Sequence, residues 1–178
     1  MARQSARRRG VIPVSSALPA SEKQRSLDEL ADLAQSYRRQ GKTLVWTNGC
    51  FEILHAGHIE FFIKAARLAD VFIVGVNSDA SVEKLKGEGR PLTTLAERMH
   101  VLAAVECVDY LTVFDAPNCA TWLERLQPEV YAKGLHHLHG GIDPEERAIV
   151  ERSGGCIALI AGDPAKSTAN IVSKIRGG

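Results

Sequence analysis

The sequence lacks the features that define several large classes of protein. Its four cysteines show no CxxC spacing, so neither a zinc site nor a disulfide framework is predicted, and we expect a reducing, cytoplasmic location. It has no run of about 18 apolar residues that could cross a bilayer, and the arginines near the N-terminus are not followed by the apolar segment of a signal peptide. A GxGxxG fingerprint is missing, and residues 87–90 have neither the lysine nor the hydroxyl of a Walker A loop.

An excess of charge of one sign is also missing. Lysine and arginine total 22 against 21 acidic residues, for a net charge of +1, so no global field favours nucleic acid or an anionic membrane. We therefore expect small-molecule partners, with no nucleic acid and no membrane. Any basic site must be local.

The chain divides into a short tail and one domain. Residues 1–25 are rich in arginine, serine and proline with little apolar periodicity, and we expect a disordered basic tail. A nucleic-acid-binding arm is the alternative, although the tail has no interleaved aromatic residues. Residues 26–178 are long enough to form a single core, which should occupy 43–176 after a helix that Ser26 caps and Gly41 ends.

Short apolar runs alternate with helical patterns after Gly41. Alternation of this kind predicts an α/β fold with a Rossmann-like, doubly wound parallel sheet in three α/β/α layers. In such sheets, ligands bind beyond the carboxyl ends of the strands. The expected strands are 44–46, 71–76, 110–113, 130–132 and 157–160, and the expected helices are 59–68, 95–105, 120–126, 144–152 and 168–175.

The most informative segment is 47–58, an HxGH element that follows an apolar run and opens a helix. Free N–H groups in the first turn of a helix attract anions, and Gly57 leaves room for a phosphate. His55 and His58 are three residues apart, so both rings can face one ligand. The alternatives are a metal pair, for which Glu52 is the only further local ligand, or two structural histidines.

Two further segments have chemistry suited to phosphate. Lys84, Lys86 and Arg90 surround two glycines in a basic segment, residues 84–90, that can close over phosphates; the alternative is a solvated loop. Ser167 and Thr168 stand at a second helix N-terminus and provide either another anion site or an ordinary cap.

The stretches TNGCFEILHAGH, VNSDASVEKLKGEGRP, ERM, KG and KSTANI occur in this order. Together they resemble the cytidylyltransferase-like nucleotidyltransferase family over about residues 43–176, and within it the heptose 1-phosphate adenylyltransferases of ADP-heptose synthesis. The resemblance implies an HUP-type fold and in-line attack by an acceptor phosphate on the α-phosphorus of a nucleoside triphosphate. Pyrophosphate would leave, and Mg²⁺ would accompany the triphosphate.

The resemblance also implies roles for individual residues, and no protein-bound metal is expected. For Asn77 and Asp79 the alternative is a turn and helix cap, and for Arg98 it is a surface ion pair. The catalytic residues would be His55, His58, Lys86 and Arg98. The nucleotide would be bound by Thr47, Asn48, Gly49, Cys50, Phe51, Gly57, Lys133, Gly134, Ser167 and Thr168. The acceptor would be bound by Asn77, Asp79, Arg90, His136 and His137.

The chain departs from the family pattern at two places. Glu52 stands where the family has aspartate, which can alter the geometry of the metal or acceptor. Residues 135–141 read LHHLHGG in place of Gly-Asp-aromatic, and the three histidines of this segment are an acceptor site, a metal cluster or a solvated loop. The acceptor is therefore the least determined part of the function.

The expected function is transfer of a nucleotide, from ATP, to D-glycero-D-manno-heptose 1-phosphate for cell-surface glycan synthesis. Alternatives are cytidylyl or adenylyl transfer to glycerol 3-phosphate, a phosphorylated amino alcohol or FMN. A nucleotide-binding regulator without turnover is the alternative of a different class. We also expect a homodimer or higher homo-oligomer and a separate sugar kinase upstream.

Overall fold

The computed structural model describes residues 20–135, 141–163 and 166–177. Its centre is a five-stranded, all-parallel sheet with the order β3-β2-β1-β4-β5. The strands are β1 (Leu44–Gly49), β2 (Val71–Asn77), β3 (Tyr110–Phe114), β4 (Val130–Gly134) and β5 (Cys156–Ile160). The helices are α1 (Ala20–Lys23), α2 (Leu27–Arg39), α3 (Ala56–Ala66), α4 (Asp79–Lys86), α5 (Leu95–Ala103), α6 (Ala120–Leu126), α8 (Pro144–Arg152) and α9 (Thr168–Arg176).

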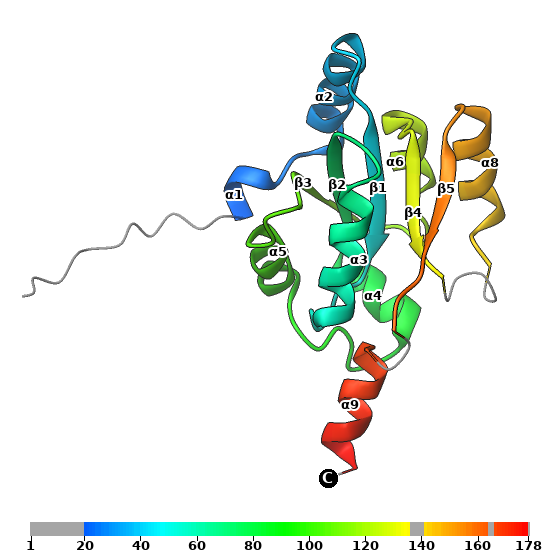
Figure 1. Ribbon diagram of the computed structural model, residues 1–178. Coiled ribbons are helices and arrows are strands. Elements are labelled where there is room, and N and C mark those ends of the chain that lie inside the picture. The colour runs from blue at the N-terminus through cyan, green and yellow to red at the C-terminus, as the bar shows by residue number, and fades with distance from the viewer. Residues whose placement is uncertain (1–19, 136–140, 164–165, 178) are drawn as a thin grey trace, which may run out of the picture.

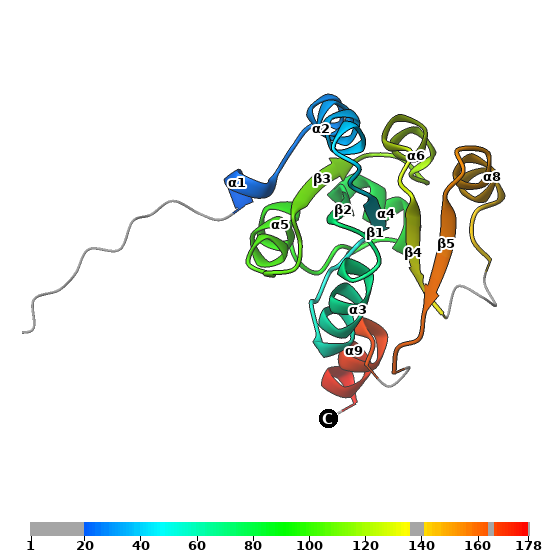
Figure 2. The same ribbon diagram turned by 45° about the horizontal axis from the view of Figure 1, so that its top comes forward.

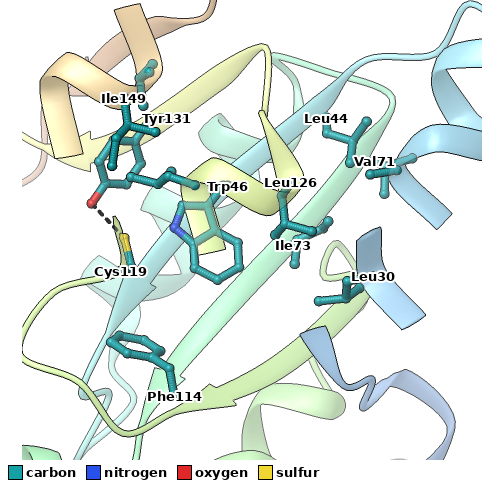
Figure 3. Packing of buried hydrophobic residues seen from close by; sticks show 13 residues of the cluster. Leu30, Leu44, Trp46, Val71, Ile73, Phe114, Cys119, Leu126, Tyr131 and Ile149 are labelled. Carbon is teal, nitrogen blue, oxygen red and sulfur yellow. Dashed lines mark hydrogen bonds between the residues drawn. The ribbon is translucent and has the colours of Figure 1, made fainter. Parts of the chain in front are cut away.

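Helices cover both faces of the sheet, as Figures 1 and 2 show. Side chains alternate between the faces along a strand, so Trp46 of β1 packs with α2, α6 and α8, whereas its neighbour Val45 packs with α3 and α5. Figure 3 shows the first of these two clusters, in which Trp46 and Tyr131 are fully buried. The predicted Rossmann-like α/β fold with three layers is confirmed.

Close packing at the centre of the sheet requires one glycine. A Cβ atom added to Gly75 in β2 would lie 2.5 Å from two ring atoms of Trp46 on the neighbouring strand. Gly75 therefore leaves the space on the neighbouring strand that the Trp46 indole ring occupies.

Two helix starts, those of α2 and α5, have a complete capping box. Ser26 and Glu29 form a reciprocal capping box at α2, which confirms the predicted cap, and Thr94 and Glu97 form another at α5. Within the described ranges, no helix is long and apolar enough to cross a membrane.

The structure corrects several predicted boundaries. Strand β1 does not end at Trp46 but continues to Gly49, because its last residues pair in register with β2. Helix α3 begins at Ala56, three residues earlier than the pattern predicted. The tail boundary at residue 25 is also wrong: 20–23 form α1, and Arg25 N–H donates to the Leu111 carbonyl of β3 at 2.9 Å. Residues 1–19 of the predicted tail lie outside the described residues.

Candidate active site

The candidate site lies beyond the carboxyl end of β1, the central strand of the sheet. Thr47, Asn48 and Gly49, which follow the predicted strand 44–46, are the last residues of β1. The chain then turns through Phe51, whose φ of 49° is left-handed, and enters α3 with His55 at the N-cap position. The first turn of α3 consequently directs its free N–H groups toward the ends of the strands.

The two histidines of the HxGH element lie against each other. Their ring centroids are 3.9 Å apart with an interplanar angle of 27°, and Phe51 lies edge-on to His58 at 5.4 Å. Burial lowers the pKa of His55, because desolvation disfavours the imidazolium. His55 Nδ1 is buried and has no hydrogen-bond partner among the described residues. A stacked pair of imidazole rings at the N-terminus of a helix is suited to donate hydrogen bonds to a phosphate.

Gly57 has a second role that the sequence did not indicate. A Cβ atom at this position would lie 2.8 Å from the Lys166 backbone oxygen. Because glycine has no side chain, the segment before α9 can pass close to the start of α3. The Thr168 hydroxyl lies 3.5 Å from the Ile53 carbonyl, and Ser167 caps α9 by accepting from Asn170 N–H. The structure thus brings Ser167 and Thr168 to the HxGH turn, with Ser167 acting at least as a cap.

A buried carboxylate anchors the basic segment. The Glu52 side chain is 0% exposed and accepts from Lys86 Nζ and Arg90 Nε, each at 2.5 Å, from Arg90 Nη2, and from Leu92 N–H at 3.2 Å. Burial by itself would raise the pKa of Glu52, but hydrogen bonds and charge from Arg90 and Lys86 outweigh it and lower the pKa to about 2. The segment is therefore held by an ion pair, and Lys84 and Lys86 lie in α4 instead of the flexible stretch that the sequence predicted.

Arg98 is neither a surface ion-pair residue nor an open phosphate ligand in this structure. Its side chain is 1% exposed, Nη1 donates to the Cys50 carbonyl at 2.6 Å, and Nη2 donates to Asp79 at 2.7 Å. Asp79 also accepts from Leu95 N–H at 3.1 Å. These contacts fix the turn after β1 against α4 and α5. The side chains of Arg98 and Asp79 therefore stabilise the elements that surround the site.

Asn77 is the last residue of β2, and its Nδ2 donates to Ser81 Oγ at 2.9 Å. Ser78, not Asp79, caps α4, because Ser78 Oγ accepts from Ser81 N–H. Both of the predicted acceptor residues on this strand end therefore have structural partners.

On the other side of β1, a buried polar chain reaches the site. Lys133 Nζ and the Tyr131 hydroxyl both lie 2.9 Å from Asn48 Oδ1. The Tyr131 hydroxyl also donates to Glu146 of α8 at 2.7 Å, and Cys119 N–H donates to the same carboxylate at 2.9 Å. Lys133 was predicted, whereas Tyr131 and Glu146 were missed. Glu146 lies in the polar stretch PEERAIVER, which is typical of a solvated helix, yet it is 4% exposed.

Two predicted acceptor residues, His136 and His137, lie outside the described residues. Within 20–135, 141–163 and 166–177, no three metal-ligating side chains form a group that could hold a metal ion. The described part of the site is therefore built from histidines, lysines, amides and backbone N–H groups, with its acidic side chains already paired.

The sequence of the protein matches the model of a known family. The model of the cytidylyltransferase-like family matches residues 46–168, which is more than half of the chain. The chain belongs to this family. As a cytidylyltransferase-like protein it is a nucleotidyltransferase, and the family resemblance carried by the sequence motifs is confirmed.

Relatives of this cytidylyltransferase-like protein agree with the assignment. The Bifunctional protein HldE of Geotalea uraniireducens is 43% identical over 172 residues, which cover 94% of this chain and 34% of the relative. The Bifunctional protein HldE of Geobacter sulfurreducens is 43% identical over 153 residues, 86% of this chain and 31% of the relative. The chain thus spans about a third of the length of these curated relatives.

A solved structure supports the fold. The lipopolysaccharide core biosynthesis protein from Thermoplasma volcanium GSS1 superposes with a TM-score of 0.56, covering 69% of this chain and 98% of that one. At 20% sequence identity, the likeness concerns the fold alone.

Proposed function

We propose that the protein transfers AMP from ATP to D-glycero-D-manno-heptose 1-phosphate and releases pyrophosphate, in the cytoplasm, for the synthesis of a cell-surface glycan. The proposed reaction rests on one observation above all: the stacked His55 and His58 at the N-terminus of α3, beyond the end of the central strand. The proposed acceptor rests on the VNSDAS and KGxGRP stretches and on the similarity to the HldE proteins.

The reaction needs little covalent chemistry from the protein. A phosphate oxygen of the sugar phosphate attacks the α-phosphorus of ATP in line, the new P–O bond forms, and the bond to the β-phosphate oxygen breaks with its electron pair leaving on pyrophosphate. Charge builds on the phosphate oxygens during this step, and positioned donors lower its energy. In this proposal His55, His58 and the first N–H groups of α3 would supply those donors.

The lysines would complete the phosphate site from two sides. Lys133 Nζ approaches from β4 and donates within the described residues to one acceptor, Asn48 Oδ1, so its other hydrogens can face a phosphate. Lys86 lies on the opposite side with its side chain 37% exposed. Binding of a triphosphate would draw Lys86 from Glu52 toward the phosphate oxygens, while Arg90 keeps Glu52 paired.

Magnesium fits this site as a partner of the triphosphate. Mg²⁺ prefers oxygen ligands and commonly binds through substrate phosphates with one or two carboxylates. Glu52 lies in the turn and Asp79 is bound to Arg98, and these two carboxylates already neutralise Lys86, Arg90 and Arg98. The phosphates would therefore hold most of the ion. When bound, it would neutralise charge on the leaving pyrophosphate.

The test is pyrophosphate release with Mg²⁺, each of the four ribonucleoside triphosphates, and a panel of acceptors. The panel contains the heptose 1-phosphate, other sugar 1-phosphates, glycerol 3-phosphate, a phosphorylated amino alcohol and FMN. Release with ATP and the heptose phosphate is expected. Release only with another pair would replace the substrates, and tight triphosphate binding without release from any acceptor would contradict the proposal.

Replacing His58 by alanine tests the role of the histidine pair. Removing one donor to a developing oxyanion costs about 3 kcal/mol, so we expect kcat/KM to fall by about 100-fold. His100→Ala, on α5, is the matched control and should keep the activity. Unchanged turnover in His58→Ala, with the fold intact by circular dichroism, would defeat this mechanism.

A further inference from the structure

Three members of the polar chain from α8 to the end of β1, namely Cys119, Glu146 and Tyr131, have no role in the mechanism above. They join a helix on one face of the sheet to Asn48 and Lys133 of the proposed nucleotide site. Figure 3 shows Tyr131 and Cys119 side by side in the core. Among the residues that the structure describes, the Glu146 carboxylate forms no ion pair with a basic side chain. A buried carboxylate of this kind is expensive in free energy unless several donors satisfy it.

Glu146 has those donors. Its Oε1 accepts from Cys119 N–H at 2.9 Å and lies 3.2 Å from Cys119 Sγ, and its Oε2 accepts from the Tyr131 hydroxyl at 2.7 Å. Burial raises the pKa of Tyr131 well above its ordinary value, and burial and the charge of Glu146 raise the pKa of Cys119 to about 12. Both groups therefore keep their protons at neutral pH and remain donors.

Tyr131 links this carboxylate to the nucleotide site in two ways. Its hydroxyl oxygen lies 2.9 Å from Asn48 Oδ1, and Lys133 Nζ lies 4.8 Å from the centre of its ring. The hydroxyl has a single hydrogen, so it donates to Glu146 or to Asn48 at any moment. Lys133 is 9% exposed and touches both the ring and the Asn48 amide, so its ammonium is fixed by these two neighbours.

We propose that Tyr131 and Glu146 are positioning residues for nucleotide binding, which act through Asn48 and Lys133 to set the direction of the Lys133 ammonium. This inference rests on the proposed function, in which Lys133 contacts the triphosphate. Glu146 and Cys119 hold the Tyr131 side chain in place, and its hydroxyl hydrogen is shared between Glu146 and Asn48. The Tyr131 ring and the Asn48 amide in turn hold the Lys133 ammonium before ATP arrives. Preorganised contacts of this kind improve binding because less freedom is lost on association.

Tyr131→Phe is the sharpest perturbation, since it keeps the buried ring and its contact with Lys133 and removes only the hydroxyl. We expect the Kd for ATP with Mg²⁺, measured by calorimetry without an acceptor, to rise about tenfold, the effect of one hydrogen bond of about 1.4 kcal/mol. The KM for ATP should rise with it, while kcat changes less than about twofold, because a ground-state contact is lost. In an Asn48→Ala background, Tyr131→Phe should have no further effect.

Tyr37→Phe is the matched control. It removes another tyrosine hydroxyl with a 2.8 Å hydrogen bond, to Tyr110 of the edge strand β3, which β2 and β1 separate from β4, and should leave the Kd unchanged. Glu146→Gln is the conservative rescue, because its amide can donate to the Tyr131 oxygen and its carbonyl can accept from Cys119 N–H. We expect Glu146→Gln to stay within about threefold of the wild type and Glu146→Leu to weaken ATP binding more than Glu146→Gln does, because leucine leaves the Tyr131 hydroxyl and Cys119 N–H without a partner. Should Glu146→Leu not fold, Tyr131→Phe and Glu146→Gln still decide the question.

The outcomes separate this inference from the proposed function. Weaker ATP binding in Tyr131→Phe than in Tyr37→Phe supports the inference even where no acceptor of the panel releases pyrophosphate. Equal binding in the two variants overturns the inference and leaves the transferase intact if the wild type turns over. A wild type that binds none of the four nucleoside triphosphates overturns both.

Discussion

Replacing Glu52 by glutamine should destabilise the protein by about 3 kcal/mol at neutral pH. The carboxylate is fully buried, and its ion pairs with Lys86 and Arg90 hold its pKa at about 2 against an ordinary value of 4.5. Each tenfold change in proton affinity corresponds to about 1.4 kcal/mol, which gives about 3 kcal/mol of stability for this difference. A glutamine of the same shape loses the charge and presents an N–H group to two cations.

The stabilisation by Glu52 should depend on pH in a definite direction. Because the pKa of Glu52 is lowered in the folded state, its stabilisation is complete above 4.5 and is lost as the pH falls through about 2. Urea unfolding of the wild type and of Glu52→Gln should therefore differ by about 3 kcal/mol at pH 7 and by about half of that at pH 3. The melting temperature at pH 7 should fall by about 6–12 °C.

Glu124→Gln provides the matched control. Glu124 pairs with Arg152, and the two side chains are 55% and 60% exposed, so the loss should stay below about 1 kcal/mol. The reasoning would be refuted if Glu52→Gln were no more destabilising than Glu124→Gln at pH 7. It would also fail if the difference from the wild type were as large at pH 3 as at pH 7.

Three further predictions concern the core, the histidine pair and the metal. Gly75→Ala should destabilise the fold by about 1–3 kcal/mol in urea unfolding, because its Cβ would lie 2.5 Å from the Trp46 ring. Gly162→Ala, whose Cβ would have no atom within 4 Å, should have little effect. Equal effects of the two substitutions would contradict the packing argument. The His55 ring should titrate below pH 6.5 in the ligand-free protein by NMR, since burial lowers its pKa, and a midpoint above that value would contradict its burial. Chelation of Mg²⁺ by EDTA should abolish pyrophosphate release and excess Mg²⁺ should restore it, and persistence of the full rate would remove the metal from the proposed reaction.

The alternation of apolar runs and helical patterns was sufficient to predict the fold. The central strands β1 and β2 are largely apolar because most of their residues are buried on both faces, and this pattern survives in a single sequence. The HxGH element was equally visible, because a turn between a strand and a helix keeps its phosphate-binding residues close together in the chain. Both predictions depend on neighbours in sequence.

Roles that depend on distant neighbours could not be predicted. Arg98 and Glu52 look like ordinary charged residues until the fold buries them against partners 19 to 48 positions away. Glu146 is 15 residues from Tyr131, on another element. Charge and hydropathy along the chain do not show which polar side chain the tertiary structure will enclose.

The position of β1 at the centre of the sheet has a consequence for the newly synthesised chain. One flank of the candidate site, with His55, His58 and Lys86, is encoded before β3, whereas Lys133 and Thr168 belong to segments that follow it. Contacts between these flanks join residues far apart in sequence and form late in folding. A newly synthesised chain would therefore have only one flank of the site until β4 and the start of α9 have docked, so tight binding of nucleotide would report that these last segments have folded.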